Sequence, residues 1–128
     1  MFSTERVSGK ILALLPGQIE PEHWHPPVGQ DMGKEETLRI AFGTLQLYVP
    51  GENNAKLCRI PQGKEACYTV MHEVVLGPGE QYTLQPGTKH WFQAGGTGAV
   101  AYTISTCARD ILDRFTDPDV VRKAEIAD

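Results

Sequence analysis

The sequence predicts an all-β fold in a single domain, with the strands arranged as a jelly-roll β-barrel. Thirteen glycines and nine prolines interrupt the 128 residues at short intervals, as a domain with many turns requires. The length suits one domain that buries roughly two thirds of the surface its unfolded chain exposes. Eight short strands fit a jelly roll, which removes most exposed sheet edges.

The expected strands lie between consecutive turn signals. Pro16-Gly17 ends the first, the loop at 26–33 ends the second, and Gly43 alone separates the third from the fourth. Later breaks fall at residues 50–51, 61–63, 77–79, 86–87 and 95–96. The strands expected between them are 10–15, 19–25, 36–42, 44–49, 66–76, 81–84, 90–93 and 99–105.

The barrel is expected over about residues 8–106, and the tail at 107–128 has the one helical pattern. Asp117 is an N-cap candidate, followed by Pro118 at the first helical position. Residues 119–127 have a helical composition with one narrow apolar stripe. We expect a short C-terminal helix that packs on the barrel or on a second subunit.

Composition restricts the partners and the compartment. Twelve Lys and Arg against 16 Asp and Glu, without a basic run, argue against nucleic-acid binding. The longest apolar run, 11–15, is too short for a membrane span and has no signal-peptide frame. Three cysteines without CxxC spacing (Cys58, Cys67 and Cys107) argue against a disulfide framework and a zinc ribbon. We expect a cytoplasmic protein with free thiols and no membrane partner.

Four residues have the spacing of a metal site. His23 and His25 are separated by one residue in an expected strand, so both imidazoles point to the same side. Glu36 begins the next strand, and His90 follows a Pro86-Gly87 turn. We predict that these three histidines and one glutamate form a metal shell that leaves room for a substrate. The alternative is that His23 and His25 only hydrogen-bond locally.

These motifs resemble those of the cupins: HxH, then a glutamate followed by six residues and a glycine, then PGxxH. They cover about residues 10–105. Longer stretches are similar to the D-lyxose isomerase family: GKEET at 33–37, the segment 43–52, LQPGTKHWFQAG at 84–95, and a tail with Arg109-Asp110 and DRFTDP at 113–118. On this basis residues 1–128 are expected to be one cupin domain.

The resemblance implies an enzyme that interconverts aldoses such as D-lyxose or D-mannose with the ketoses D-xylulose or D-fructose. It implies a divalent metal, usually Mn²⁺, with Zn²⁺, Co²⁺, Ni²⁺ and Fe²⁺ as the other ions considered. Carried onto this chain, the ligands are His23, His25, Glu36 and His90, with Glu35 as the competing carboxylate. The spacing to the glycine favours Glu36. The substrate is a monosaccharide, and a homodimer is expected because this fold commonly dimerises through an outer sheet.

Three further residues are candidates for catalysis. Lys34 and Asp113 match positions that the family places in its active site, and Lys34 could hydrogen-bond a sugar oxygen. Family members commonly carry a glutamate where this chain has Thr103, so the base that moves the proton needs another identity. Asp113, Glu73 or a metal-bound hydroxide are the candidates.

Two other functions use the same barrel. A metal-dependent oxygenase would use the same four ligands with O₂ in place of sugar hydroxyls, and the family-like tail argues against it. A non-catalytic sugar-binding cupin would hold metal and sugar without turnover, and Thr103 favours this alternative.

Overall fold

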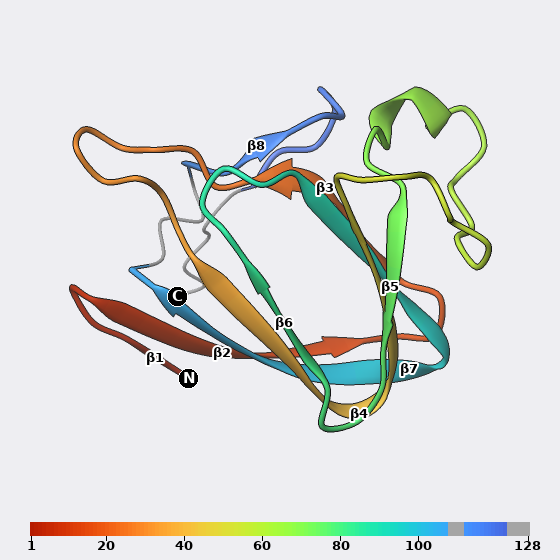
Figure 1. The fold of residues 1–128 in the computed structure, drawn as a ribbon, viewed down its shortest axis with the longest axis horizontal. Helices are drawn as coiled ribbons and strands as arrows, with labels where there is room; N and C mark the ends of the chain where they lie inside the picture. The colour runs from red at the N-terminus through yellow and green to blue at the C-terminus, as the bar shows by residue number, and fades with distance from the viewer. Residues whose placement is uncertain (108–111, 123–128) are drawn as a thin grey trace, which may run out of the picture.

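In the computed structural model, residues 1–107 and 112–122 are described, and their strands form one curled sheet. Figure 1 shows the strands wrapped around a common interior. The elements are β1 (Phe2–Ser3), β2 (Val7–Leu14), β3 (Ile19–Trp24), β4 (Glu36–Val49), the 3₁₀ helix η1 (Glu65–Cys67), β5 (His72–Leu76), β6 (Gln81–Leu84), β7 (His90–Thr106) and β8 (Arg114–Phe115).

Two long strands organise the sheet. β7 pairs antiparallel with β2, β3 and β4, and β4 also pairs with β5 and β6. Each long strand joins two strands that were expected to be separate, because the glycines at 43 and 95–96 bend the chain without ending the pairing. The expected strand at 66–76 is shorter, since η1 occupies its beginning.

A close backbone approach explains the glycine that follows Glu36 by six residues. Gly43 has a φ of 71° and lies where the β4–β7 register shifts. A Cβ atom at this position would overlap the carbonyl oxygen of Gly98. Only glycine combines a positive φ with the absence of that atom at no steric cost. The spacing therefore marks a bend that keeps β4 paired with β7 on both sides.

The sheet separates two apolar clusters. Inside the barrel, fully buried side chains from β4 and β7 pack together, among them Leu38, Leu47 and Phe92. On the other side, Trp91 stacks on Tyr48 with ring centroids 3.9 Å apart. Both are covered by the loop between β4 and β5 (residues 50–71, the covering loop), which contains Val70. Neighbouring residues of one strand thus belong to different clusters, as the alternation of side chains dictates.

The expected C-terminal helix is not observed in the part of the tail that is described. Residues 117–122 form a turn followed by irregular chain, and residues 123–127 of the expected helix lie outside the described residues. Tertiary contacts hold this segment instead: Lys64 Nζ lies 2.9 Å from Asp117 Oδ2 and 2.8 Å from Asp119 Oδ2. The Asp117 carboxylate does accept a bond from the Asp119 amide, so the capping turn forms without a helix behind it.

Two further findings concern the cysteines and membrane-spanning segments. Cys58, Cys67 and Cys107 are not joined in disulfide bonds in the described part of the chain, and each is half-buried. No helix within the described ranges has the length and apolar character needed to cross a membrane.

We predict that Gly43→Ala destabilises the protein by about 3 kcal/mol or more, because it combines a positive φ with overlap against backbone. Urea unfolding monitored by tryptophan fluorescence measures the change. Gly96→Ala is the matched control on β7, since nothing lies within 4 Å of a Cβ there. Equal stability of the two variants would contradict the close-approach explanation.

Candidate metal centre

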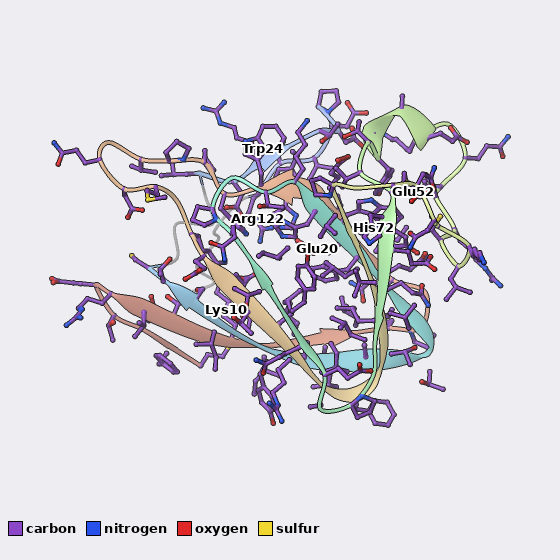
Figure 2. The ribbon with its side chains drawn as sticks, in the orientation of Figure 1. Lys10, Glu20, Trp24, Glu52, His72 and Arg122 are labelled. Atoms are coloured by element: carbon purple, nitrogen blue, oxygen red, sulfur yellow. The ribbon has the colours of Figure 1, made fainter. Side chains whose placement is uncertain are left out.

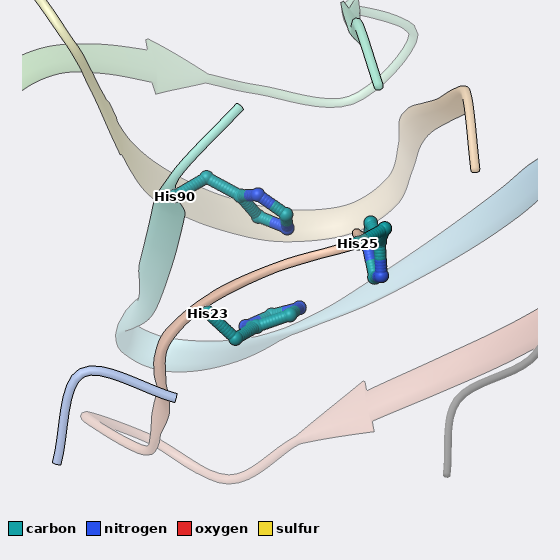
Figure 3. Close-up of side chains that lie close together, drawn as sticks. All are labelled: His23, His25 and His90. Atoms are coloured by element: carbon teal, nitrogen blue, oxygen red, sulfur yellow. The ribbon is translucent and has the colours of Figure 1, made fainter. Parts of the chain in front are cut away.

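Three buried histidines meet at one end of the barrel. His23 is on β3, His25 follows directly after that strand, and His90 begins β7 opposite His23 in the ladder. One ring nitrogen from each lies within 4.8 Å of the others. Figure 3 shows the three rings gathered around a common point. The structure thus brings together the three imidazoles that the sequence predicted for the site.

Each of these rings is fixed by a hydrogen bond from Nδ1. His23 Nδ1 donates to the Pro21 carbonyl at 2.7 Å, and His90 Nδ1 donates to the Thr88 carbonyl at 2.9 Å. His25 Nδ1 donates to Asp113 Oδ1 at 2.7 Å. Because a carbonyl can only accept, the proton is on Nδ1 and Nε2 keeps its lone pair. This is the arrangement by which proteins orient metal-binding histidines.

Two of the Nε2 atoms have no partner within the described part of the chain. His25 Nε2 and His90 Nε2 are buried and make no hydrogen bond. A buried polar atom without a partner costs about 1–3 kcal/mol, so native proteins rarely leave two side by side. A divalent metal ion satisfies both, and neutral imidazole suits Mn²⁺, Zn²⁺ and related ions. The donor set therefore fits a metal.

Burial keeps the imidazoles of His23 and His90 neutral. Desolvation lowers the pKa of His23 to about 4 and that of His90 to about 3, the latter with a further contribution from the neighbouring His23. A metal ligand needs the neutral form. His23 and His90 are therefore in the form that can bind a metal at neutral pH.

Asp113 lies behind His25, away from the centre of the cluster. Its side chain is 3% exposed, with Oδ1 on His25 and Oδ2 3.5 Å from Arg122 Nε. Burial opposes ionisation of Asp113, but the hydrogen bond from His25 and nearby positive charge outweigh it and lower its pKa. The residue has the contacts of a group that orients a ligand.

Glu36 and Lys34 form a buried ion pair beside the histidines. Lys34 Nζ lies 2.7 Å from Glu36 Oε2, and both side chains are under 10% exposed. Both line a cavity of about 100 Å³ together with His23 and His25. Glu36 is thus near the cluster, and its carboxylate is joined to Lys34 in this structure.

The cavity contains four polar residues that sequence reasoning did not select as catalytic or ligating: Lys10, Glu20, Thr103 and Arg122. Arg122 Nη2 lies 3.0 Å from Glu20 Oε1. Lys10 pairs directly across from Thr103, and burial together with nearby Lys34 lowers the pKa of Lys10. Arg122 comes from the tail, and no local sequence pattern indicates its arrival here.

Glu73 lies elsewhere. Its Oε2 accepts hydrogen bonds from the Tyr48 hydroxyl at 2.8 Å and from the amides of Lys56 and Leu57. This carboxylate ties the covering loop to β5 and does not line the histidine cavity.

Trp91 and Phe92 follow His90 on β7, and because side chains alternate along a strand they lie on opposite faces of the sheet. Phe92 lines the cavity, while Trp91 belongs to the other cluster and donates from Nε1 to the Val70 carbonyl at 2.8 Å. Trp24 lies under the Lys89 ammonium, 5.0 Å from its ring centroid, away from the cavity.

A family model described as D-lyxose isomerase matches residues 3–128. The chain belongs to this family. It is 55% identical over 122 residues to the D-lyxose ketol-isomerase of Cohnella laeviribosi, covering 94% of this chain and 67% of that protein. It is 50% identical over 127 residues to the D-lyxose/D-mannose isomerase of Thermosediminibacter oceani, covering 98% of this chain and 70% of that protein. A ketol-isomerase is an intramolecular oxidoreductase, so the expected enzyme class is that of the D-lyxose isomerase family.

Solved structures confirm the cupin fold. L-ribose isomerase of Cellulomonas parahominis with L-psicose superposes with a TM-score of 0.75 at 16% identity, covering 88% of this chain and 58% of that one. A Klebsiella pneumoniae protein with a double-stranded β-helix domain gives a TM-score of 0.62 at 14% identity, covering 91% of this chain and 79% of that one. The chain thus spans somewhat more than half of the L-ribose isomerase structure.

We predict that Asp113→Ala weakens Mn²⁺ binding about 10–100-fold, because His25 loses the acceptor that fixes its ring. Isothermal titration calorimetry measures the affinity. Asp119→Ala is the control, since that exposed carboxylate pairs with Lys64, away from the histidines. Unchanged affinity in Asp113→Ala would contradict the orienting role.

We also predict that the metal-free protein loses stability as the pH falls from about 6.5 to about 4. In this window the unfolded chain binds protons at His23 and His90 that the folded chain excludes, so the free energy of unfolding decreases, by of order 3 kcal/mol for His23 alone. Urea titrations across this range measure it. His90→Gln reduces the slope, and His72→Gln, on β5 outside the cavity, leaves it unchanged; the reverse pattern would contradict the assignment.

Proposed function

We propose that this chain catalyses metal-dependent aldose–ketose isomerisation, converting D-lyxose to D-xylulose and D-mannose to D-fructose. The observation that carries the proposal is the set of three buried imidazoles whose Nδ1 atoms are all occupied and which each place a ring nitrogen within 4.8 Å of the others. Membership of the D-lyxose isomerase family and the names of the relatives support the substrates. Mn²⁺ is the proposed ion, because it accepts imidazole and carboxylate together and keeps positions for substrate oxygens.

His23, His25, Glu36 and His90 are the proposed ligands. Such an ion would polarise the sugar carbonyl and stabilise the negative charge that develops on O1 and O2. The hydrogen bonds on the three Nδ1 atoms hold the rings in place while the substrate binds. Glu36 lies at the start of β4 beside this cluster, and binding a cation would replace or share its contact with Lys34.

Lys34 is proposed to bind the substrate. Its ammonium is buried at the cavity wall, 2.7 Å from Glu36, and can donate more than one hydrogen bond. A sugar oxygen next to it gains a charge-assisted bond. Phe92 provides an apolar surface on the same cavity for the carbon face of the sugar.

The working form is proposed to be a cytoplasmic homodimer. Apolar side chains on the outer face of β1, β2 and β7 are about half exposed, including Phe2, Ile11, Tyr102 and Ile104. Ile11 and Tyr102 are direct cross-strand partners, so they form a continuous patch that a second copy could cover. Light scattering of the purified protein tests this assembly.

The test of the function is ketose formation from D-lyxose and D-mannose by Mn²⁺-loaded protein, with oxygen uptake recorded in parallel. We expect D-xylulose and D-fructose without oxygen uptake, and a loss of more than about 100-fold in Glu36→Ala, since loss of groups behind the ligands already costs 10–100-fold. Protein that holds Mn²⁺ but forms no ketose would contradict the proposal and favour a non-catalytic sugar-binding cupin. Oxygen uptake with sugar oxidation would favour the oxygenase.

We predict that Lys34→Met lowers kcat/KM about 10–100-fold, because a charged hydrogen bond contributes about 1.5–3 kcal/mol. Steady-state kinetics with D-lyxose measure it, with metal content determined for each sample. Lys89→Met is the matched control, since its ammonium lies over Trp24 outside the cavity. An unchanged kcat/KM in fully loaded Lys34→Met would refute the substrate contact.

A further inference from the structure

A β-bulge in β3 brings Glu20 to the same face as the metal-site histidines. In the ladder with β7, Glu20 is opposite Phe92 and His23 is opposite His90, so three steps on β3 match two on β7. Residues directly opposite each other in an antiparallel pair project to the same face. Phe92 and His90 are two apart and both face inward, so Glu20 and His23 also face inward.

Regular alternation of side chains along β3 would instead turn Glu20 away from the cavity. Without the bulge, Glu20 would share a face with Glu22, which points away from the cavity. Glu22 is 1% exposed and accepts bonds from the Thr69 amide at 2.6 Å, the Thr69 hydroxyl at 2.7 Å and the Val70 amide at 3.2 Å. The extra residue lets one strand anchor the covering loop with Glu22 and supply Glu20 to the site.

Three carboxylates line the cavity among the described residues, and they differ in accessibility. Asp113 is 3% exposed with both oxygens engaged, and Glu36 is 8% exposed in its pair with Lys34. The Glu20 side chain is 32% exposed, and its contact with Arg122 is through Oε1. Glu20 is therefore the carboxylate of this cavity that a bound sugar can reach. Figure 2 labels Glu20 and Arg122, which meet from opposite ends of the sequence.

We propose that Glu20 is the catalytic residue that moves the proton between C1 and C2 of the sugar. This rests on the proposed isomerase function and supplies the base that Thr103 does not provide. Arg122 is assigned a positioning role, since its guanidinium contacts Oε1 of Glu20 at 3.0 Å and both residues line the cavity.

The step balances without an added reactant. In the aldose-to-ketose direction Glu20 takes the proton from C2, the C2–H electron pair forms the C1–C2 double bond, and the C1 carbonyl electrons move to O1. The protonated Glu20 then returns a proton to C1 while the O2 hydroxyl proton moves to O1, which leaves C2 as the carbonyl. No atom is gained or lost, and the carboxylate is regenerated.

The experiment uses Mn²⁺-loaded Glu20→Gln, Glu20→Asp and Glu20→Ala with D-lyxose in D₂O. We expect kcat to fall at least about 100-fold in Glu20→Gln with Mn²⁺ content unchanged, the range for loss of a general base. Glu20→Asp is expected to retain more activity than Glu20→Gln, and added formate to restore part of the activity of Glu20→Ala. Glu52→Gln is the control, an exposed loop carboxylate that Figure 2 places away from Glu20.

Solvent deuterium gives an independent readout. Wild-type protein is expected to place deuterium at C1 of the ketose, because the partly exposed Glu20 exchanges its proton with water. The assignment is overturned by Glu20→Gln with wild-type kcat, by Glu20→Ala that formate does not rescue, or by wild-type ketose without deuterium. Failure of the wild type to isomerise any sugar would instead overturn the proposed function, so the two failures are distinguishable.

Discussion

The site depends on the hydrogen bonds that fix the Nδ1 atoms of His23, His25 and His90. Two acceptors are backbone carbonyls two residues before the histidine, so the strand that carries each ring also sets its tautomer. The third is Asp113, which comes from a segment 88 residues away. Because each Nδ1 is engaged in a hydrogen bond, the other ring nitrogens are left to face one another in the interior, where burial lowers the pKa of His23 and His90. The long β7 strand makes this possible, since it delivers His90 opposite His23 and pairs with β2 and β4 over the rest of the barrel.

Around this point, the charges of the cavity are distributed in pairs. Lys34 neutralises Glu36, while Arg122 lies between Glu20 and Asp113. Lys10 lines the same cavity, and its burial together with the nearby Lys34 ammonium lowers its pKa. A wall of compensated charges can hydrogen-bond a neutral polyol from several sides without favouring an anion or a cation. Such a wall suits the neutral monosaccharide that we propose as the substrate.

The clustering of the three histidines and the fold class could be predicted from the sequence because both are governed by short-range rules. Alternation places His23 and His25 on one face, and a proline-glycine turn precedes His90. Glu20 could not be found in this way, since the bulge that turns it inward depends on the pairing of β3 with β7. The contact of Arg122 with Asp113 and that of Asp113 with His25 are long-range, so no local pattern in the sequence indicates them. The tail also carried a helix signal that its contacts with Lys64 override in the described part.

The most direct test of the central claim is a crystal structure of the Mn²⁺-loaded protein with anomalous data at the manganese edge. The account predicts one strong anomalous peak at coordination distance from Nε2 of His23, His25 and His90, with a Glu36 oxygen completing the protein ligands. A fully loaded crystal whose peak lies away from these three nitrogens, or that places the metal on Nδ1, would contradict the account.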